Sequence, residues 1–360
     1  MTSAMPSSRT IRLGTRASAL ATAQSGMVAR ALESAATAAG ERVRVELVPV
    51  RTQGDVDPSS LASMGGVGAF AAALRMAVLN GQCDVAVHSY KDLPTEPVDG
   101  LRVWAVPKRD DPFDALCARN GWDVDDLPRK ARVGTGSPRR AAQLLLRRPD
   151  LRIIDIRGNV PTRLSRVLGS RVWPDGPLGV SRPDLDGVVV AMAGLMRLGL
   201  TGYVTEPFDE ETMLPAAAQG ALAVEARIDA DPLLTSLLTT LDHPETRAEV
   251  VAERAVMEGL EAGCAAPVGV YAQVTERGLA LDAAVIAVNG TQAVRSRLRI
   301  PDISGAEALG HRIASDLLGY GAGDVADLHA TKPHRTEAGR CPHAPQRQRR
   351  PGHWPGPACG

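Results

Sequence analysis

The stretch IRLGTRASALATAQSGMVARAL, residues 11–32, decides the fold class of this chain. Its first five residues, 11–15, predict a short buried strand. Ser18 is a plausible N-cap, because a serine side chain there accepts a hydrogen bond from a free N–H of the first helical turn. Apolar residues then recur at helical spacing, at Leu20, Ala23, Met27, Ala31 and Leu32. A strand that leads directly into a helix is typical of α/β proteins.

The alternation of strand and helix continues beyond this stretch. Residues 43–50 and 83–88 predict further strands. Between them, a helix is marked by Phe70, Leu74, Ala77 and Val78. This order favours a largely parallel sheet covered by helices.

Two more structural units follow along the chain. The second unit, after residue 112, has strands expected at 131–135, 152–156 and 187–192 and helices at 139–146 and 162–168. The third has a helix from 243 to about 260, strands at 268–274 and 279–288, and a helix near 304–318. We expect the first two units to share one plan, with ligands bound between them at the carboxyl ends of strands.

The composition is that of a globular protein, with 44% apolar and 23% charged residues. A length of 360 residues suggests two or three domains. The net charge is zero, but residues 331–360 hold six basic residues and one acidic residue. The remaining 35 basic and 40 acidic residues give the body a net charge of −5. An acidic body with 3% aromatic residues argues against a nucleic-acid enzyme.

The cysteine pattern indicates a reducing compartment. The five cysteines are an odd number and include no C-x-x-C pair, which fits neither a disulfide framework nor a zinc site. We therefore expect a cytoplasmic protein. We expect neither a signal peptide nor a membrane span, because no apolar run is long enough. Residues 331–360 contain six prolines and no apolar periodicity, which predicts a disordered tail.

Three segments place Arg, Ser or Thr directly after a predicted strand and before a helix. They are Thr15 to Ser18, Thr135 to Arg140, and Arg157 to Asn159. The free N–H groups of a helix start and the nearby guanidinium groups together favour an anionic ligand. No complete phosphate-binding motif occurs, so a polycarboxylate suits these segments as well as a phosphate does. Taken singly, each arginine could equally form a solvated ion pair.

Two loops carry groups that are capable of chemistry. His88 to Pro94 places Lys91 beside Asp92, whose carboxylate can move a proton or stabilise a cation. The alternative is a structural turn closed by Pro94. Cys264 lies among small residues in the loop 261–267, where its thiolate could be a nucleophile. The alternative is a small buried hydrophobic residue.

Eight stretches resemble the hydroxymethylbilane synthase (porphobilinogen deaminase) family, in the family's order and up to about residue 325. They are IRLGTRASALATAQ (11–24), GGVGAFAAALRMAVLNGQCDVAVHSYKDLPTE (65–96), RDDPFDAL (109–116), VGTGSPRRAAQLLLRRPDLRI (133–153), RGNVPTRL (157–164), AGLMRLGL (193–200), LPAAAQGALAVEAR (214–227) and ETRAEVVAERAVMEGLEAGCAAPVGVYA (245–272).

The resemblance implies an α/β protein of three domains. Two lobes like those of periplasmic solute-binding proteins would flank a cleft, and a small α+β C-terminal domain would carry the cofactor. The implied ranges are 11–107 with 221–238 for domain 1, 113–214 for domain 2, and 243–325 for domain 3. The family's enzymes are monomers that join four porphobilinogens head to tail, with loss of ammonia, to give hydroxymethylbilane.

The resemblance also implies the site. Asp92 matches the catalytic aspartate, and Cys264 would hold a dipyrromethane cofactor through a thioether, with no metal or nucleotide. Cofactor contacts would come from Lys91, Thr135, Ser137, Arg139 and Arg140. Substrate contacts would come from Arg16, Ser18, Arg157, Arg163 and Arg197. The arginines would neutralise the acetate and propionate groups of the pyrroles.

The chain departs from the family pattern at several points. Val67 stands where many members have Lys, and Pro138 replaces a Leu and suits a helix start. The loop 169–184 is longer than expected, and the tail after 330 matches nothing in the family. The alternative function is a non-catalytic, two-lobed polycarboxylate-binding protein, which would share the arginines but would not need Asp92 or Cys264. Neither function calls for a membrane or a nucleic-acid partner.

Overall fold

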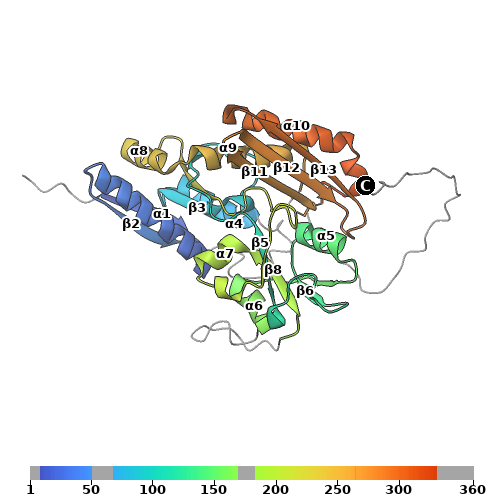
Figure 1. Cartoon of the computed structure of the whole chain (residues 1–360). Helices are drawn as coiled ribbons and strands as arrows, with labels where there is room; N and C mark the ends of the chain where they lie inside the picture. Colours follow the sequence, from blue (N-terminus) through green and yellow to red (C-terminus); the bar gives the residue numbers. More distant parts are fainter. Residues whose placement is uncertain (1–8, 51–67, 169–182, 264, 331–360) are drawn as a thin grey trace, which may run out of the picture.

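The computed structural model describes residues 9–50, 68–168, 183–263 and 265–330. Three β-sheets form its framework (Figure 1). Cys264, Val67, the tail 331–360 and most of the loop 169–184 lie outside the described residues. What was predicted for them therefore stays a prediction.

The first sheet has the strand order β2-β1-β3-β10-β4. Its strands are β1 (Arg9–Thr15), β2 (Val43–Pro49), β3 (Val85–Ser89), β4 (Leu101–Ala105) and β10 (Leu222–Arg227). β1 runs parallel to β2 and β3, whereas β10 runs antiparallel to β3 and β4. Helices α1 (Ala19–Ala38) and α8 (Pro232–Leu241) pack on one face, and α4 (Gly68–Leu79) packs on the other.

The second sheet has the strand order β7-β6-β8-β5-β9. Its strands are β5 (Asp114–Ala118), β6 (Arg132–Gly134), β7 (Arg152–Ile154), β8 (Gly187–Ala191) and β9 (Glu206–Pro207). β6 runs parallel to β7 and β8, and β5 runs antiparallel to β8 and β9. Helices α6 (Val160–Leu168) and α7 (Met192–Arg197) cover one face, and α5 (Pro138–Arg147) covers the other.

The two sheets share one topology, as the sequence predicts. In each sheet three parallel strands are followed by one antiparallel strand and then by an edge strand. The antiparallel strand is the first one formed after the chain crosses between the sheets: β5 follows the connection 106–113, and β10 follows the connection 208–221. The carboxyl ends of the parallel strands therefore lie at a common edge of each sheet.

The prediction of largely parallel sheets is wrong for the outer part of each sheet. β4, β5, β9 and β10 form antiparallel pairs, and the residue pattern alone did not indicate them. The cause is the double crossing of the chain, because a strand that returns from the other sheet enters from the opposite end. The helix α7 also begins at Met192, a residue that the pattern assigned to the preceding strand.

Helix α1 begins as predicted but buries a different face. Ser18 has the extended backbone of an N-cap, and its Oγ accepts a hydrogen bond from the N–H of Ala21 at 3.3 Å. Of the predicted core positions, however, Met27 and Ala31 are exposed. The buried residues are Gln24, Ser25, Val28, Ala29, Leu32 and Ala36. This stripe repeats at intervals of four residues, which keeps it on the side that faces the sheet.

The third sheet is a simple antiparallel one. It consists of β11 (Val268–Thr275), β12 (Gly278–Ile286) and β13 (Ala293–Ile300), and the sequence pattern did not indicate β13. Helices α9 (Pro244–Gly259) and α10 (Ala306–Gly319) cover one face of it, as Figure 1 shows, and α11 (Ala322–Val325) follows. Short 3-10 helices lie at Tyr90–Asp92, Arg119–Gly121, Thr201–Tyr203 and Ile303–Gly305. In the described part of the chain, no helix has the length and apolar character needed to cross a membrane.

The two connections between the first and second sheets meet at Gly220. Its φ is +86°, a left-handed conformation that favours glycine. A Cβ atom there would lie 2.5 Å from the carbonyl oxygen of Asp110 and 2.9 Å from that of Asp111. Both oxygens belong to backbone, which cannot rotate away as a side chain can. The close approach of the two connections therefore depends on this glycine.

We expect Gly220→Ala to destabilise the protein by roughly 2–4 kcal/mol, the combined cost of a left-handed alanine and of overpacking. Denaturant unfolding would measure this change. Gly199→Ala is the matched control, because Gly199 also has a positive φ, +67°, but a Cβ there meets no atom within 4 Å. Equal losses in the two variants would show that the backbone clash contributes nothing.

Candidate active site

The site begins at the carboxyl end of the first sheet. Lys91 and Asp92 lie in the 3-10 helix directly after β3, and both are exposed. Arg16 follows β1, is half-buried, and lies at the same sheet edge because β1 and β3 are parallel. Ser18 caps α1 close behind it. Two of the predicted segments, Thr15 to Ser18 and His88 to Pro94, thus follow neighbouring parallel strands.

The second sheet contributes its own carboxyl edge. Thr135 follows β6, is buried, and accepts a hydrogen bond from the N–H of Ser137 through Oγ1 at 3.2 Å. Ser137 is the N-cap residue of α5, although its side chain makes no capping hydrogen bond. Pro138 occupies the start of the helix, as predicted, since it has no N–H to satisfy there. Arg139 and Arg140 then fall in the first helical turn.

Arg139 and Arg140 are buried and share one carboxylate. Asp114, at the start of β5, is fully buried and accepts hydrogen bonds from Nη2 of each arginine at 2.7 Å. Arg139 also donates to the carbonyl oxygen of Leu214, and Arg140 donates to that of Val189. Within the described residues, Nε of Arg139 is buried without a hydrogen-bond partner. The two guanidinium groups are thus fixed in place and carry one net positive charge with Asp114.

Burial and the neighbouring charges together shift the pKa values of Asp114 and Arg139. Burial by itself would raise the pKa of Asp114, but the positive charges of Arg139 and Arg140 outweigh burial and hold the pKa well below its ordinary value. Burial lowers the pKa of Arg139, and Asp114 opposes that effect. At neutral pH the carboxylate of Asp114 is therefore ionised.

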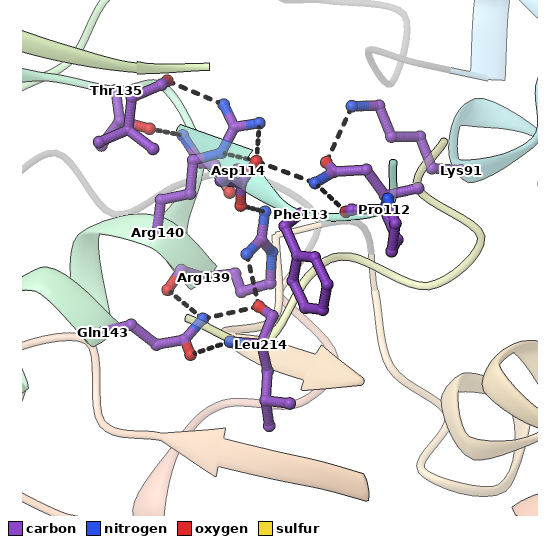
Figure 2. A network of polar contacts seen from close by, with 12 residues as sticks. Lys91, Pro112, Phe113, Asp114, Thr135, Arg139, Arg140, Gln143 and Leu214 are labelled. Atoms are coloured by element: carbon purple, nitrogen blue, oxygen red, sulfur yellow. Dashed lines mark hydrogen bonds and ion pairs between the residues drawn. The ribbon is translucent and has the colours of Figure 1, made fainter. Parts of the chain in front are cut away.

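Gln219 joins the two sheets at this point. Its Nε2 donates to Oδ1 of Asp114 at 2.9 Å, and its Oε1 accepts from Nζ of Lys91 at 3.1 Å. Figure 2 labels Asp114 and Lys91 in this network. Lys91 of the first sheet is thereby connected through Gln219 to the arginine pair of the second sheet. We call these five residues, Lys91, Asp114, Arg139, Arg140 and Gln219, the Asp114 cluster.

Lys91 has an unusual environment for a lysine. The residue as a whole is exposed, but desolvation of its ammonium group lowers the pKa of Lys91 to about 8. Asp92 and Asp114 act in the opposite direction and favour the charged form. The guanidinium groups of Arg140 and Arg139 add to the lowering. Such a perturbed group is a common feature of functional sites.

Arg163 completes the group from helix α6. Its Nε donates to the carbonyl oxygen of Gly158 at 2.8 Å, and among the described residues it forms no ion pair. Burial lowers the pKa of Arg163 to about 10, and Arg140 and Arg157 contribute to this. Asp155 and Asp92 oppose the shift, so the guanidinium lies within electrostatic reach of the candidate catalytic carboxylate.

The site carries an excess of positive charge. Lys91, Arg139, Arg140 and Arg163 provide four cationic groups, and they interact electrostatically with the two carboxylates Asp92 and Asp114. Arg157 and Asp155, both exposed, form a loose pair at 3.6 Å and add no net charge. An excess of two positive charges at the meeting edges of two sheets fits a ligand with several carboxylates.

Arg197 contacts the two connections between the sheets. Its Nε donates to Asp110 at 2.8 Å, and its Nη2 donates to the carbonyl oxygen of Gly220 at 2.6 Å. The side chain is buried, and burial lowers the pKa of Arg197 while Asp110 opposes the shift. In this structure its guanidinium forms hydrogen bonds to both connecting segments, 106–113 through Asp110 and 208–221 through Gly220.

The loop around residue 264 is bound to the end of the described chain. The N–H of Gly263 donates to the carbonyl oxygen of Leu328 at 2.8 Å, and that of Ala265 donates to the carbonyl oxygen of Ala330 at 3.1 Å. A Cβ at position 263 would lie 2.4 Å from the oxygen of Ala330. Cys264 itself lies outside the described residues, so its role stays a prediction.

Sequence reasoning did not find Asp114 and Gln219. Asp114 starts a strand that is otherwise apolar, and all five residues of that strand are buried. A lone acid in such a strand requires a cationic partner, and this signal was available in the stretch 109–116. Gln219 gave no such signal, because its three partners lie at least 100 residues away in sequence.

We expect Asp114→Asn to destabilise the protein by roughly 3–5 kcal/mol, because it leaves two buried guanidinium groups without a counter-ion. Denaturant unfolding at neutral pH would measure the loss. The matched control is Asp125→Asn: Asp125 forms a 2.6 Å pair with Arg147, but its side chain is 66% exposed. That variant should lose less than about 1 kcal/mol. Similar losses of stability in the two variants would show that burial of the Asp114 ion pairs does not increase their contribution to stability.

Comparison with known proteins places the chain in a family. The family model described as "Porphobilinogen deaminase, dipyromethane cofactor binding domain" matches residues 11–235, and the model for the C-terminal domain of the same enzyme matches residues 247–319. The chain belongs to the porphobilinogen deaminase family. Porphobilinogen deaminase of Cutibacterium acnes is 51% identical over 338 residues, which cover 89% of this chain and 98% of that protein. Porphobilinogen deaminase of Thermobifida fusca is 49% identical, with 89% and 97% covered.

Solved structures give a weaker likeness. The methionine-binding protein MetQ is 13% identical, with a TM-score of 0.38, and the match covers 64% of this chain and 89% of that one. A likeness at this level carries no argument about the site. The family membership therefore stands on the sequence matches, and the α/β architecture of three sheets stands on the strand order.

Proposed function

We propose that this chain condenses four porphobilinogen molecules head to tail to give hydroxymethylbilane, a linear tetrapyrrole. Each step releases one ammonia, and one water enters when the product leaves. The observation that carries the proposal is the meeting of Lys91 and Asp92 with Arg139, Arg140 and Arg163 at the edges of two sheets. Every pyrrole unit bears an acetate and a propionate, so the growing chain needs this excess of cationic groups.

The residues of this site suit the dipyrromethane cofactor, which the matching family model names. Two buried guanidinium groups share a single carboxylate, and Nε of Arg139 is buried with no partner among the described residues. We propose that Lys91, Thr135, Ser137, Arg139 and Arg140 hold the carboxylates of the cofactor. When bound, through a thioether to Cys264, the cofactor supplies the terminal pyrrole to which the first substrate is joined.

Asp92 is the proposed catalytic residue. Loss of ammonia leaves a positive charge on the substrate pyrrole, and a carboxylate stabilises such a charge and can accept or return a proton. Asp92 is exposed at the strand end, and Lys91 precedes it in the same 3-10 helix. A carboxylate that is open to a ligand and lies next to Lys91, among groups of the opposite charge, suits this role.

We propose that substrate carboxylates are bound by Arg16, Arg157 and Arg163, with Ser18 adding a hydrogen bond. Arg157 is exposed and only loosely paired with Asp155, so it can turn to a ligand. For Arg197, substrate binding stays a prediction, because Asp110 and Gly220 engage its guanidinium here. The negative charge of a ligand would compensate the excess positive charge that these side chains leave.

We further propose three domains, 11–107 with 221–238, 113–214 and 243–325, one around each sheet. We also propose that the protein acts as a monomer in the cytoplasm, in line with its family. Among the described residues, Cys83 and Cys117 are free cysteines, which is usual in a reducing compartment.

The experiment that tests the function follows substrate and protein together. Purified protein is incubated with porphobilinogen, and we expect substrate loss, release of one ammonia per porphobilinogen consumed, and a linear tetrapyrrole as the product. Intact mass before the reaction should exceed the mass of the chain by a two-pyrrole group. A two-lobed binding protein without catalysis would bind porphobilinogen and release no ammonia, and that result would refute the proposal.

A further inference from the structure

Gln219 occupies the connection between β9 and β10, where the two sheets meet, and it is 1% exposed. Its Nε2 donates to the carbonyl oxygen of Pro112 at 2.8 Å and to Oδ1 of Asp114 at 2.9 Å. Its Oε1 accepts from Nζ of Lys91 at 3.1 Å. Figure 2 shows the side chains of this network around Asp114. The carboxamide thus contacts groups from both sheets.

The chemistry of these contacts fixes the orientation of the carboxamide. A primary amide has two N–H donors and one oxygen acceptor. Here both donors face oxygen atoms, and the acceptor faces an ammonium. The reversed amide would place an NH₂ group against Lys91 and an oxygen against the Asp114 carboxylate, which is doubly unfavourable. Only one of the two orientations of the Gln219 amide is therefore favourable, and it places the oxygen acceptor against Lys91.

Lys91 needs such an acceptor to stay where it is. The guanidinium groups of Arg139 and Arg140 repel its ammonium, and Asp92 and Asp114 attract it. Among the described residues, Nζ donates a hydrogen bond only to Gln219. Without that acceptor the flexible lysine side chain would move away from the two arginines.

We propose that Gln219 is a positioning residue of the condensation reaction. It holds the ammonium of Lys91, from the first sheet, at a fixed place relative to the arginine pair of the second sheet. A carboxylate-bearing pyrrole chain that lies across both sheet edges then meets these cations at a constant spacing, beside Asp92. This inference rests on the function proposed above and adds a residue that acts through Lys91.

The test is a double-mutant cycle with porphobilinogen as substrate. Gln219→Met keeps the length of the side chain and removes its hydrogen bonds, and we expect kcat/KM to fall about tenfold, a typical effect of losing one hydrogen bond to a charged group. Lys91→Met is measured alone and combined with Gln219→Met. If Gln219 acts through Lys91, the second substitution adds little to the first. Losses that multiply would show an independent structural effect and overturn the proposal.

The pH profile gives a second measurement. If the charged form of Lys91 binds substrate, kcat/KM falls as the pH rises past its pKa of about 8. The acceptor on Gln219 favours the ammonium, so its removal lowers the pKa of Lys91 and moves this limb of the profile to lower pH. The other groups that face Lys91, which are Asp92, Asp114, Arg139 and Arg140, are unchanged in the variant. An unmoved limb would count against the proposal.

A matched control is Gln143→Met. Gln143 is half-buried, and its carboxamide makes three hydrogen bonds to backbone: two with Leu214 and a longer one, at 3.4 Å, to the carbonyl oxygen of Arg139. It has no contact with Lys91 or Asp92, so its loss should lower the unfolding midpoint and leave kcat/KM within about twofold. Wild-type protein that fails to consume porphobilinogen would refute the proposed function. An active wild type with an unaffected Gln219→Met variant would refute only the role of Gln219.

Discussion

Asp92→Asn should lower the turnover of porphobilinogen by at least about 100-fold, the usual contribution of a general acid or base. The amide has nearly the shape of the carboxylate but carries no charge and cannot accept the proton. Asp92 lies at the end of β3, beside the ammonium of Lys91 and within electrostatic reach of Arg163. Steady-state rates of ammonia release, measured at saturating porphobilinogen, would give the loss.

The control for this variant is Asp155→Asn. Asp155 is also an exposed carboxylate at a strand end, and it also faces Arg163, but it is not next to Lys91. Its loss should change turnover by less than about threefold. Intact mass should show that both variants still carry the two-pyrrole group, so that a missing cofactor does not explain the result. Turnover close to wild type in Asp92→Asn would remove Asp92 from the catalytic role.

The part of the fold that follows from local pattern was predictable. β1, α1, β2 and the strands and helices from β6 to α6 lie close to the expected ranges, because each has its own hydrophobic period and a cap or breaker at its ends. The start of α5 at Pro138 is one case, since proline at the first helical position costs no hydrogen bond.

The antiparallel strands β5 and β10 were not predictable in this way. Each carries a buried acid: Asp114 in β5 pairs with Arg139 and Arg140, and Glu225 in β10 accepts hydrogen bonds from Arg75. A charged residue obscures the apolar pattern of a central strand. Arg75 lies 150 residues away from Glu225 in sequence, so no local pattern reveals the compensation.

The same reason limits prediction of the site. Lys91, Arg139, Arg140 and Arg163 could be predicted as site residues because arginines and lysines after strands are visible in sequence, and the fold brings them near Asp92. The residues that hold them, Asp114 and Gln219, become recognisable only when both sheets are in place. Long-range contacts of this kind determine which cations are free to meet a ligand and which are already engaged.

The environments of Cys83 and Cys117 leave Cys264 as the best candidate for cofactor attachment. The two family models span 11–235 and 247–319 and contain Cys83, Cys117 and Cys264. Cys83 is 1% exposed and Cys117 is fully buried. Burial raises the pKa of Cys117 to about 12, and burial with the neighbouring Asp84 raises the pKa of Cys83. Neither thiol is accessible or readily ionised, so neither suits a nucleophile.

Cys264→Ala should therefore abolish attachment of the two-pyrrole group and, with it, the production of hydroxymethylbilane. Alanine offers no nucleophile, and no other thiol in the family-matched ranges can replace it. Cys83→Ala and Cys117→Ala are matched controls that should lose stability through a small cavity but keep the added mass. Cys341→Ser combined with Cys359→Ser tests the two cysteines that follow residue 330. A two-pyrrole mass increase in Cys264→Ala would place the thioether elsewhere, and the control that had lost it would identify the residue.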